Sequence, residues 1–157
     1  VLVMPEPQVT RVGKRIMSLS DPSVKMSKSE SGKGDIYLTD DLKTMRKKIM
    51  SAVTDSGSEI YVDEENKPGI TNLLTIYAAL TDKSLESCAA QFKDYRYGDF
   101  KKEVANVVID TLGPFQAKAM SFLESGEVDR VLSEGAKKAT VIANKTLVKV
   151  KKAVGLL

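Results

Sequence analysis

Two lysines and two serines fall within five consecutive positions, Lys25-Met26-Ser27-Lys28-Ser29, in a segment with few apolar residues. A Lys ammonium supplies compact positive charge, and Ser hydroxyls and backbone N–H groups donate hydrogen bonds, so such a segment can fold around a polyphosphate. A loop that closes on its ligand can also supply contacts that exist only in the transition state. The segment is therefore a candidate phosphate-binding loop, although an ordinary surface loop with two lysines also fits its composition.

The rest of the composition restricts the chemistry that remains. The chain has no histidine and one cysteine, Cys88. This excludes Ser-His and Cys-His catalysis and any histidine-based or Cys-only metal site, so we expect no resident metal. The apolar neighbours of Cys88 at helical spacing predict a small core residue rather than a nucleophile, and a lone cysteine fits a reducing compartment.

Short apolar segments flank the candidate loop. Residues 1–4 form an apolar run that ends at Pro5 and predict a buried strand, and residues 15–19 are a second strand candidate. Between residues 20 and 35 the chain is mostly Ser, Gly, Lys and Asp, which predicts a loop. We therefore interpret the first quarter of the chain as the remnant of an α/β layer.

From residue 39 onward, apolar residues recur at the spacing of amphipathic helices, which predicts a helical bundle and a mainly α chain. The expected boundaries are caps at Thr39 or Asp40, Ser84 and Asp99, a break or kink at Gly113-Pro114, and stops at Gly126 and Gly135.

Charge and hydropathy narrow the class of protein further. Apolar residues make up 42% of the chain and charged residues 29%, as in ordinary globular domains, and no apolar run approaches the length of a membrane span. The net charge of +3 permits an anionic partner without requiring one. Lysines and arginines cluster within residues 43–48 and 137–152, and solvated helix faces are the simpler interpretation of both clusters.

Further motifs accompany the lysine-serine segment in a defined order. They are Arg15-Ile16-Met17-Ser18-Leu19, Asp21-Pro22, Leu38-Thr39-Asp40-Asp41, Lys47-Lys48-Ile49, Ser51-Ala52-Val53-Thr54-Asp55, Asn66-Lys67-Pro68-Gly69-Ile70, Asn72-Leu73-Leu74, Tyr97-Gly98-Asp99-Phe100-Lys101 and a final helix beginning near Gly135-Ala136. With Lys25-Met26-Ser27-Lys28-Ser29, the signature loop of class I aminoacyl-tRNA synthetases, this series resembles bacterial tryptophanyl-tRNA synthetases along essentially the whole chain.

The resemblance implies ATP-dependent activation of tryptophan and its transfer to tRNA. Lys25, Met26, Ser27, Lys28 and Ser29 would bind ATP. Lys28 would be the main contact to the β and γ phosphates and the leaving pyrophosphate, and Lys25 and the two serines would position the rest. Ile16, nine residues before Lys25, would meet the adenine side of ATP. Magnesium would accompany the phosphates, held largely by them and by water.

The resemblance also implies a division of the chain. Residues 1–38 would be the C-terminal part of a Rossmann-like α/β catalytic domain, and residues 39–157 a helical tRNA anticodon-binding region with a returning C-terminal helix. The family's histidine-containing signature and most of its tryptophan pocket are not in this chain, so we expect the chain alone to be inactive. A cytoplasmic enzyme that forms a homodimer as a full-length protein is the matching expectation.

The helical part offers candidates for contacts with tRNA. Lys47, Lys48, Lys93, Lys101 and Lys102 are candidates for contacting backbone phosphates. Arg96, which lies between Tyr95 and Tyr97, could combine a cation with stacking rings at an unpaired base, or both tyrosines could fill gaps between helices. Two alternatives to a tryptophan enzyme stay open: a non-catalytic helical RNA-binding module and a tyrosyl-tRNA synthetase.

Overall fold

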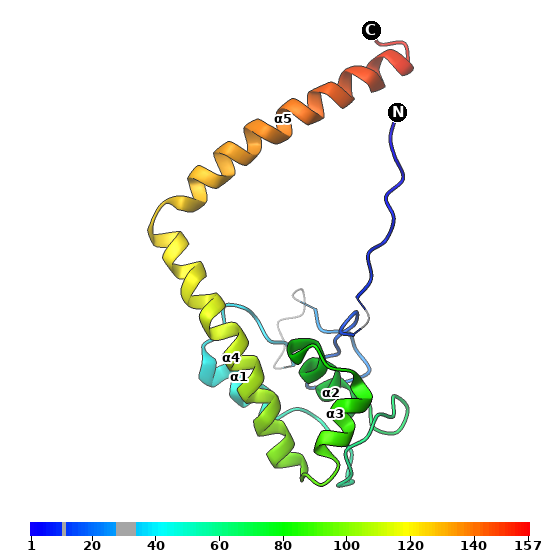
Figure 1. Cartoon of the computed structure of the whole chain (residues 1–157), viewed down its shortest axis with the longest axis vertical. Helices are drawn as coiled ribbons and strands as arrows, with labels where there is room; N and C mark the ends of the chain where they lie inside the picture. Colours follow the sequence, from blue (N-terminus) through cyan, green and yellow to red (C-terminus); the bar gives the residue numbers. More distant parts are fainter. Residues whose placement is uncertain (11, 28–33) are drawn as a thin grey trace. The chain divides into compact units, whose positions relative to one another are not determined.

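The structure, a computed structural model, describes residues 1–10, 12–27 and 34–157. These residues form five helices: α1 (Leu42–Met50), α2 (Pro68–Thr81), α3 (Leu85–Phe92), α4 (Tyr97–Glu124) and α5 (Glu127–Ala153) (Figure 1). The β pairing recorded within the described residues is a single antiparallel bridge between Met17 and Lys25. The prediction of a mainly α chain is confirmed. None of the helices in the described part combines the length and apolar character needed to cross a lipid bilayer.

Residues 9–116 form one compact unit whose core comes mainly from α1 to α4. α2 packs against α3, and α1 lies beside α4, where Arg46 Nη2 donates to Asn106 Oδ1 at 2.9 Å (Figure 1). Phe92 lies at the centre of the core, with its ring centroid 4.8 to 5.1 Å from those of three other aromatic rings. Cys88 is fully buried, which confirms that it is a core residue.

The first helix is capped by a different residue from those predicted. Asp41 caps α1 by accepting hydrogen bonds from the N–H groups of Lys43 and Thr44, whereas Thr39 and Asp40 do not cap it. α2 begins at Pro68, where proline's fixed φ suits the first helical position. Gly69 follows because a Cβ there would lie 2.1 Å from the carbonyl oxygen of Val53. The cap predicted at Ser84 is confirmed for α3, since Ser84 Oγ accepts from the N–H of Ser87.

α4 is longer than predicted at both points where the sequence indicated a boundary. It starts at Tyr97, so Asp99 lies in the first turn and is not the cap that was predicted. An acidic side chain in this turn interacts favourably with the helix dipole. Of the break or kink predicted at Gly113-Pro114, the break is wrong, because α4 continues through Pro114. Gln116 explains part of this, since its Nε2 donates to the carbonyl oxygens of Leu38 and Asp40 at 2.7 Å each and so holds this stretch in place.

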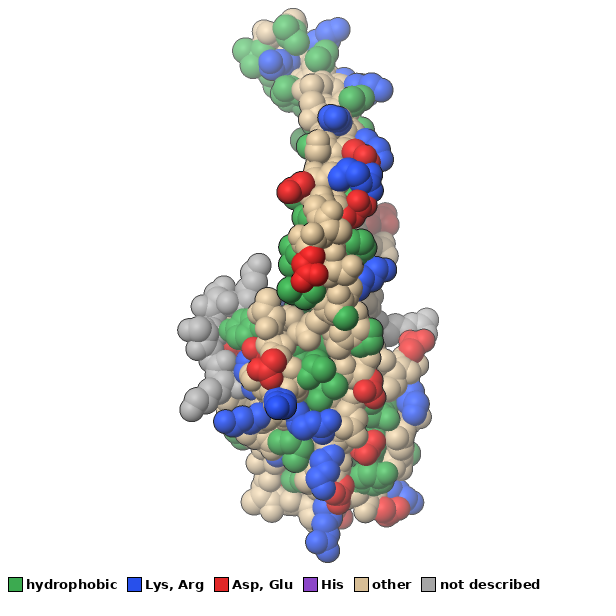
Figure 2. Space-filling view, turned by 90° about the vertical axis from the view of Figure 1, so that its left-hand side faces the viewer, with side chains coloured by type: hydrophobic (Ala, Val, Ile, Leu, Met, Phe, Trp, Pro, Cys, Tyr) green, Lys and Arg blue, Asp and Glu red, His purple; other side chains and the backbone are tan. Residues whose placement is uncertain are grey.

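The second unit consists of residues 1–8 and 117–157 and contains α5. The stop predicted at Gly135 is wrong, because α5 runs without interruption from Glu127 to Ala153. A single helical glycine costs only about 1 kcal/mol, and Arg130 forms ion pairs with both Glu127 and Glu134 along this stretch. No α5 side chain is buried, and Figure 2 shows hydrophobic and charged side chains mixed along the helix.

The strand predicted for residues 1–4 is wrong as well. Val1 to Met4 have no helical or strand assignment, and their side chains are 69% to 92% exposed. A strand needs a neighbouring strand to pair its backbone groups, and no pairing with these residues is recorded in the described part of the chain.

Candidate functional site

The predicted phosphate-binding loop begins on a short hairpin. Met26 N–H donates to the carbonyl oxygen of Ile16 at 3.0 Å, and Ser18 N–H donates to that of Val24 at 2.8 Å. These two bonds flank the Met17–Lys25 bridge. Ile16, Lys25, Met26 and Ser27 therefore lie at the open end of the hairpin, whereas Lys28 and Ser29 lie outside the described residues.

Asp21 shapes the closed end of the hairpin. Its carbonyl oxygen accepts from Val24 N–H at 3.0 Å, and its Oδ1 accepts from the N–H and hydroxyl of Ser23 at 3.0 and 2.6 Å. The Ser23 hydroxyl, followed by the Ser23 N–H, holds the pKa of the Asp21 carboxyl below its usual value. The Asp21-Pro22 motif is thus a tight turn that sets the direction of the segment entering the loop.

The hairpin has one apolar and one polar face. Residues directly opposite in an antiparallel pair share a face, and neighbours along a strand alternate. Ile16 and Met26 are half-buried on the face that packs on the core, where they line an apolar pocket of about 240 Å³. Lys25 is exposed on the opposite face, which it shares with Met17.

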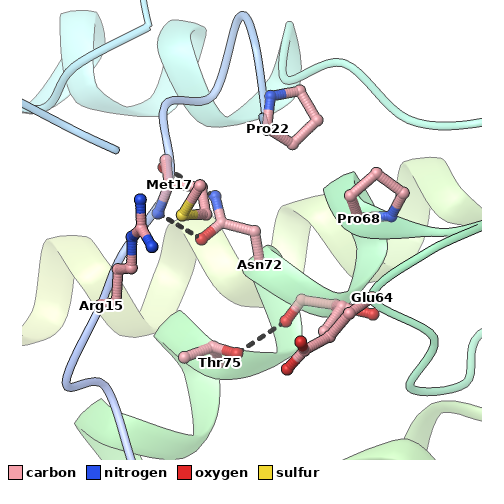
Figure 3. A pocket seen from close by; sticks show the side chains of 8 residues that line it. Arg15, Met17, Pro22, Glu64, Pro68, Asn72 and Thr75 are labelled. Atoms are coloured by element: carbon pink, nitrogen blue, oxygen red, sulfur yellow. Dashed lines mark hydrogen bonds between the residues drawn. The ribbon is translucent and has the colours of Figure 1, made fainter. Parts of the chain in front are cut away.

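A second pocket, also of about 240 Å³, lies against this polar face (Figure 3). Arg15 and Met17 line it from the hairpin, and Asn72 and Thr75 line it from α2. Asn72 is 4% exposed, and its side-chain amide forms two hydrogen bonds with the backbone of Met17. Oδ1 accepts from Met17 N–H at 2.8 Å, and Nδ2 donates to Met17 O at 2.8 Å. The first strand of the hairpin is therefore attached to α2.

The segment that follows the loop is attached at two further points. Leu19 N–H donates to the carbonyl oxygen of Gly34 at 2.7 Å, and a Cβ on Gly34 would lie 2.0 Å from Ser18 Oγ. Lys48 Nζ donates to the carbonyl oxygen of Asp35 at 2.8 Å and forms an ion pair with Asp40 at 2.6 Å. Residues on both sides of the loop are thus held against the same unit.

These contacts alter the set of lysines expected to meet RNA. Lys48 has the two intramolecular partners just described and is 16% exposed. Lys101 Nζ donates to Ala52 O at 2.7 Å, beside the C-terminus of α1, and burial lowers the pKa of this amine. Lys47 and Lys93 are exposed, and Lys102 is an exposed partner of Asp99. Figure 2 shows lysine and arginine side chains gathered on the face that α1 and the first part of α4 form.

A polar cluster of three residues connects three segments of the first unit: Lys67, which is buried, and Asp55 and Tyr97, which are half-buried. Lys67 Nζ donates to Asp55 Oδ1 at 2.9 Å and to Tyr97 Oη at 2.8 Å, and the Tyr97 hydroxyl donates to the Asp55 carboxylate at 2.9 Å. Asp55 follows α1, Lys67 immediately precedes α2, and Tyr97 is the first residue of α4. The cluster therefore joins the ends of three helices. Each lies in a motif that was recognised separately, but nothing in the spacing indicated that the three side chains meet.

The electrostatics of the Asp55–Lys67–Tyr97 cluster favour its charged form. Burial alone would raise the pKa of Asp55, but hydrogen bonds from Lys67, Gly57 N–H and Tyr97 outweigh it and leave the pKa below its usual value. The bonds to Tyr97 and Asp55 raise the pKa of Lys67. Burial, the largest effect, raises the pKa of Tyr97. Lys67 therefore acts as a cationic structural link and is not a nucleophile at neutral pH.

The two tyrosines beside Arg96 are both engaged within the protein. Tyr97 belongs to the polar cluster, and the ring of Tyr95 packs edge-on against Phe92 with centroids 5.1 Å apart. Tyr97 therefore fills a gap between helices, whereas Tyr95 has one side of its ring on the core and stays 41% exposed. The described residues contain no group of three or more His, Cys, Asp or Glu side chains that could hold a metal ion.

Comparisons with known proteins relate this geometry to a family. Residues 3–113 match the family model for class I tRNA synthetases of the tryptophan and tyrosine type. The chain is 49% identical to the tryptophan–tRNA ligase of Halalkalibacterium halodurans and 46% identical to that of Bacillus subtilis, in each case over 99% of this chain and 48% of the relative. It thus spans about half the length of the curated relatives it matches.

Solved structures agree with these relatives. The tryptophanyl-tRNA synthetase of Mycoplasma pneumoniae matches 71% of this chain and 36% of its own, with a TM-score of 0.65 and 34% identity. That of Campylobacter jejuni matches 98% of this chain and 46% of its own, with a TM-score of 0.64 and 27% identity. The hairpin with its lysine-serine segment, the helices that hold it and these matches together show that the chain belongs to the class I tRNA synthetases of the tryptophan and tyrosine group.

Proposed function

We propose that this chain supplies the ATP-phosphate loop and the tRNA-binding helices of a tryptophan–tRNA ligase. Such an enzyme activates tryptophan with ATP, releases pyrophosphate and then transfers the tryptophanyl group to tRNA. The 157 residues correspond to about half of the relatives' length, so the chain alone is expected not to aminoacylate.

The hairpin is the observation that carries the proposal. It presents the exposed Lys25 at the start of the loop, opposite Met17 and two residues before Ser27. On its other face, Ile16 and Met26 line an apolar pocket that can contact a purine ring. An apolar side chain, Met26, and a cationic one, Lys25, therefore follow each other at the start of one loop on opposite faces of the hairpin, and a loop that folds over a nucleotide can use both.

Lys25 and Lys28 would stabilise the charge that develops on the β and γ phosphates, with Lys28 as the main contact. Ser27, Ser29 and the backbone of Met26 would orient the rest of the triphosphate. No covalent protein intermediate is needed, because positioning and electrostatic stabilisation account for the chemistry. Magnesium would be held by the phosphates and water.

The helices after the loop would serve the tRNA. In this proposal residues 1–38 complete the catalytic domain, and residues 39–157 form the anticodon-binding region with its returning helix. The exposed cations Lys43, Arg46 and Lys47 on α1 would contact backbone phosphates. The full-length protein would act as a cytoplasmic homodimer.

A reconstituted enzyme tests the proposal. It joins this chain to the part of the H. halodurans tryptophan–tRNA ligase that this chain does not match. We expect tryptophan-dependent ATP–pyrophosphate exchange, reduced about 10²-fold by Lys25→Ala or Lys28→Ala if each lysine acts in the transition state. Binding of tRNA should weaken steeply with salt.

Three results would change the assignment. Exchange that depends on tyrosine would indicate a tyrosyl-tRNA synthetase. Salt-sensitive tRNA binding without exchange, in a correctly folded protein, would indicate a helical RNA-binding module. Exchange that is unchanged by both lysine substitutions would remove the phosphate role of the loop.

A further inference from the structure

We infer that Asn72 is a positioning residue for the Lys-Met-Ser-Lys-Ser loop, acting on Lys25 and Met26 through the backbone of Met17. This inference rests on the proposed function of the loop and adds to it a residue that lies outside the loop. Asn72 is 55 positions away from Met17 in the sequence and belongs to α2.

The hydrogen bonding of Asn72 is suited to holding a strand. Its amide accepts from Met17 N–H and donates to Met17 O, both at 2.8 Å, and so substitutes for a neighbouring strand at this residue (Figure 3). The remaining edge of the first hairpin strand pairs with the second strand through Ile16 and Ser18. Met17 is therefore held from both sides, by α2 on one and by the second strand on the other.

The helix that carries Asn72 is itself firmly placed. Asn72 lies in a stretch of α2, residues 69–74, in which every residue is buried. The N-terminus of this helix is bound to the preceding segment, where Thr71 Oγ1 accepts from Asp63 N–H and donates to Asp63 O at 2.9 Å each. A side chain on such an element can set the position of a loop more accurately than the loop can by itself.

The chemical consequence concerns the Lys25 ammonium. Met17 is the residue opposite Lys25 in the bridge, so a shift of Met17 moves the backbone from which Lys25 projects. Misplacement by about 1 Å can reduce a rate by roughly 10²-fold, even when the altered residue is remote from the reacting atoms. Asn72 would thus affect the rate of the chemical step more than the binding of tryptophan.

Asn72→Asp in the reconstituted enzyme is the direct test. The substitution preserves volume and the bond from Met17 N–H, but it places a carboxylate oxygen against Met17 O in place of a donor. We expect kcat for ATP–pyrophosphate exchange to fall at least about tenfold, while the KM for tryptophan stays the same. Thr75→Val is the matched control, because Thr75 lines the same pocket one turn along and bonds only to Thr71 O within α2.

A double-mutant cycle distinguishes positioning from a general structural role. If Asn72 acts through the hairpin, its effect on kcat should largely disappear in a Lys25→Ala background, whereas two independent effects would multiply. Multiplied effects, or an unchanged kcat in Asn72→Asp, would overturn the inference. An unchanged kcat in Lys25→Ala alone would also overturn the inference, whereas an unchanged kcat in both Lys25→Ala and Lys28→Ala would overturn the proposed function of the loop, so the two failures are distinguishable.

Amide hydrogen exchange gives a second measurement that does not depend on catalysis. In Asn72→Asp, the N–H groups of Ser18 and Met26, which bond across the hairpin, should lose protection. The N–H groups in the middle of α4 should keep theirs. Full protection of Ser18 and Met26 in this variant would show that Asn72 does not hold the hairpin.

Discussion

Gly69→Ala should destabilise the first unit strongly, because two backbone segments meet at Gly69. A Cβ there would lie 2.1 Å from Val53 O, 3.1 Å from Val53 C and 3.2 Å from Thr54 Cα. All three are backbone atoms, so the contact cannot be relieved by the rotation of a side chain. Relieving the contact requires a separation of at least about 1 Å, which would also strain the 2.7 Å hydrogen bond from Val53 N–H to Leu19 O.

The expected loss of stability follows from two unfavourable contributions and one favourable contribution. Overpacking of this kind costs about 1–3 kcal/mol, and weakening one backbone hydrogen bond adds about 1 kcal/mol. The better helix propensity of alanine returns at most about 1 kcal/mol. We therefore expect the free energy of unfolding to fall by roughly 1–3 kcal/mol.

Urea unfolding followed by tyrosine fluorescence measures this loss. The chain has no tryptophan, and all five tyrosines lie in residues 9–116, so the signal reports on the unit that contains Gly69. Gly98→Ala is the matched control, because Gly98 is the second residue of α4, as Gly69 is of α2, and no atom lies within 4 Å of its added Cβ. If Gly69→Ala unfolds at the same urea concentration as the wild type, the close approach to Val53 is not real.

Three further predictions concern other parts of the first unit. Gly34→Ala, whose Cβ would lie 2.0 Å from Ser18 Oγ, should lower exchange activity in the reconstituted enzyme, and removal of that oxygen by Ser18→Ala should restore part of it. Cys88 is fully buried, and burial raises its pKa, so a thiol reagent at neutral pH should label it only in urea; rapid labelling of the folded chain would contradict the packing of the core. For Asp55, hydrogen bonding outweighs burial and lowers the pKa, so its contribution to stability is present above about pH 4 and is lost as the pH falls through the lowered pKa. Urea unfolding between about pH 6 and about pH 3 should therefore show a smaller pH dependence for Asp55→Asn than for the wild type.

Local chemistry was enough to predict much of the helical part. Apolar residues at helical spacing indicated α1 to α3, and the Ser84 cap and the buried Cys88 followed from the same pattern. These predictions succeeded because capping and amphipathic burial depend on residues only three or four positions apart. The order of the motifs also identified the family from the residues alone.

Predicted interruptions were less reliable, since surrounding contacts can outweigh a local preference. Pro114 removes one helical hydrogen bond, yet α4 continues through it. Two residues later, Gln116 donates hydrogen bonds to the carbonyl oxygens of Leu38 and Asp40. Gly135 likewise lies inside α5. A glycine or proline inside a helix makes the helix less stable by about 1 to 3 kcal/mol relative to alanine. Whether the helix ends there depends on the tertiary contacts on either side.

The candidate site shows the same division between sequence and tertiary structure. The sequence by itself determined which residues can carry the chemistry, because lysine charge and serine hydroxyls are properties of residue type, and their order identifies the loop. Only the tertiary structure decided what holds the segments on either side of that loop: Asn72 on Met17 and Lys48 on Asp35. The physical reason is that a hydrogen bond requires two groups within about 3 Å, and for residues 13 to 55 positions apart only the folded path of the chain brings them that close.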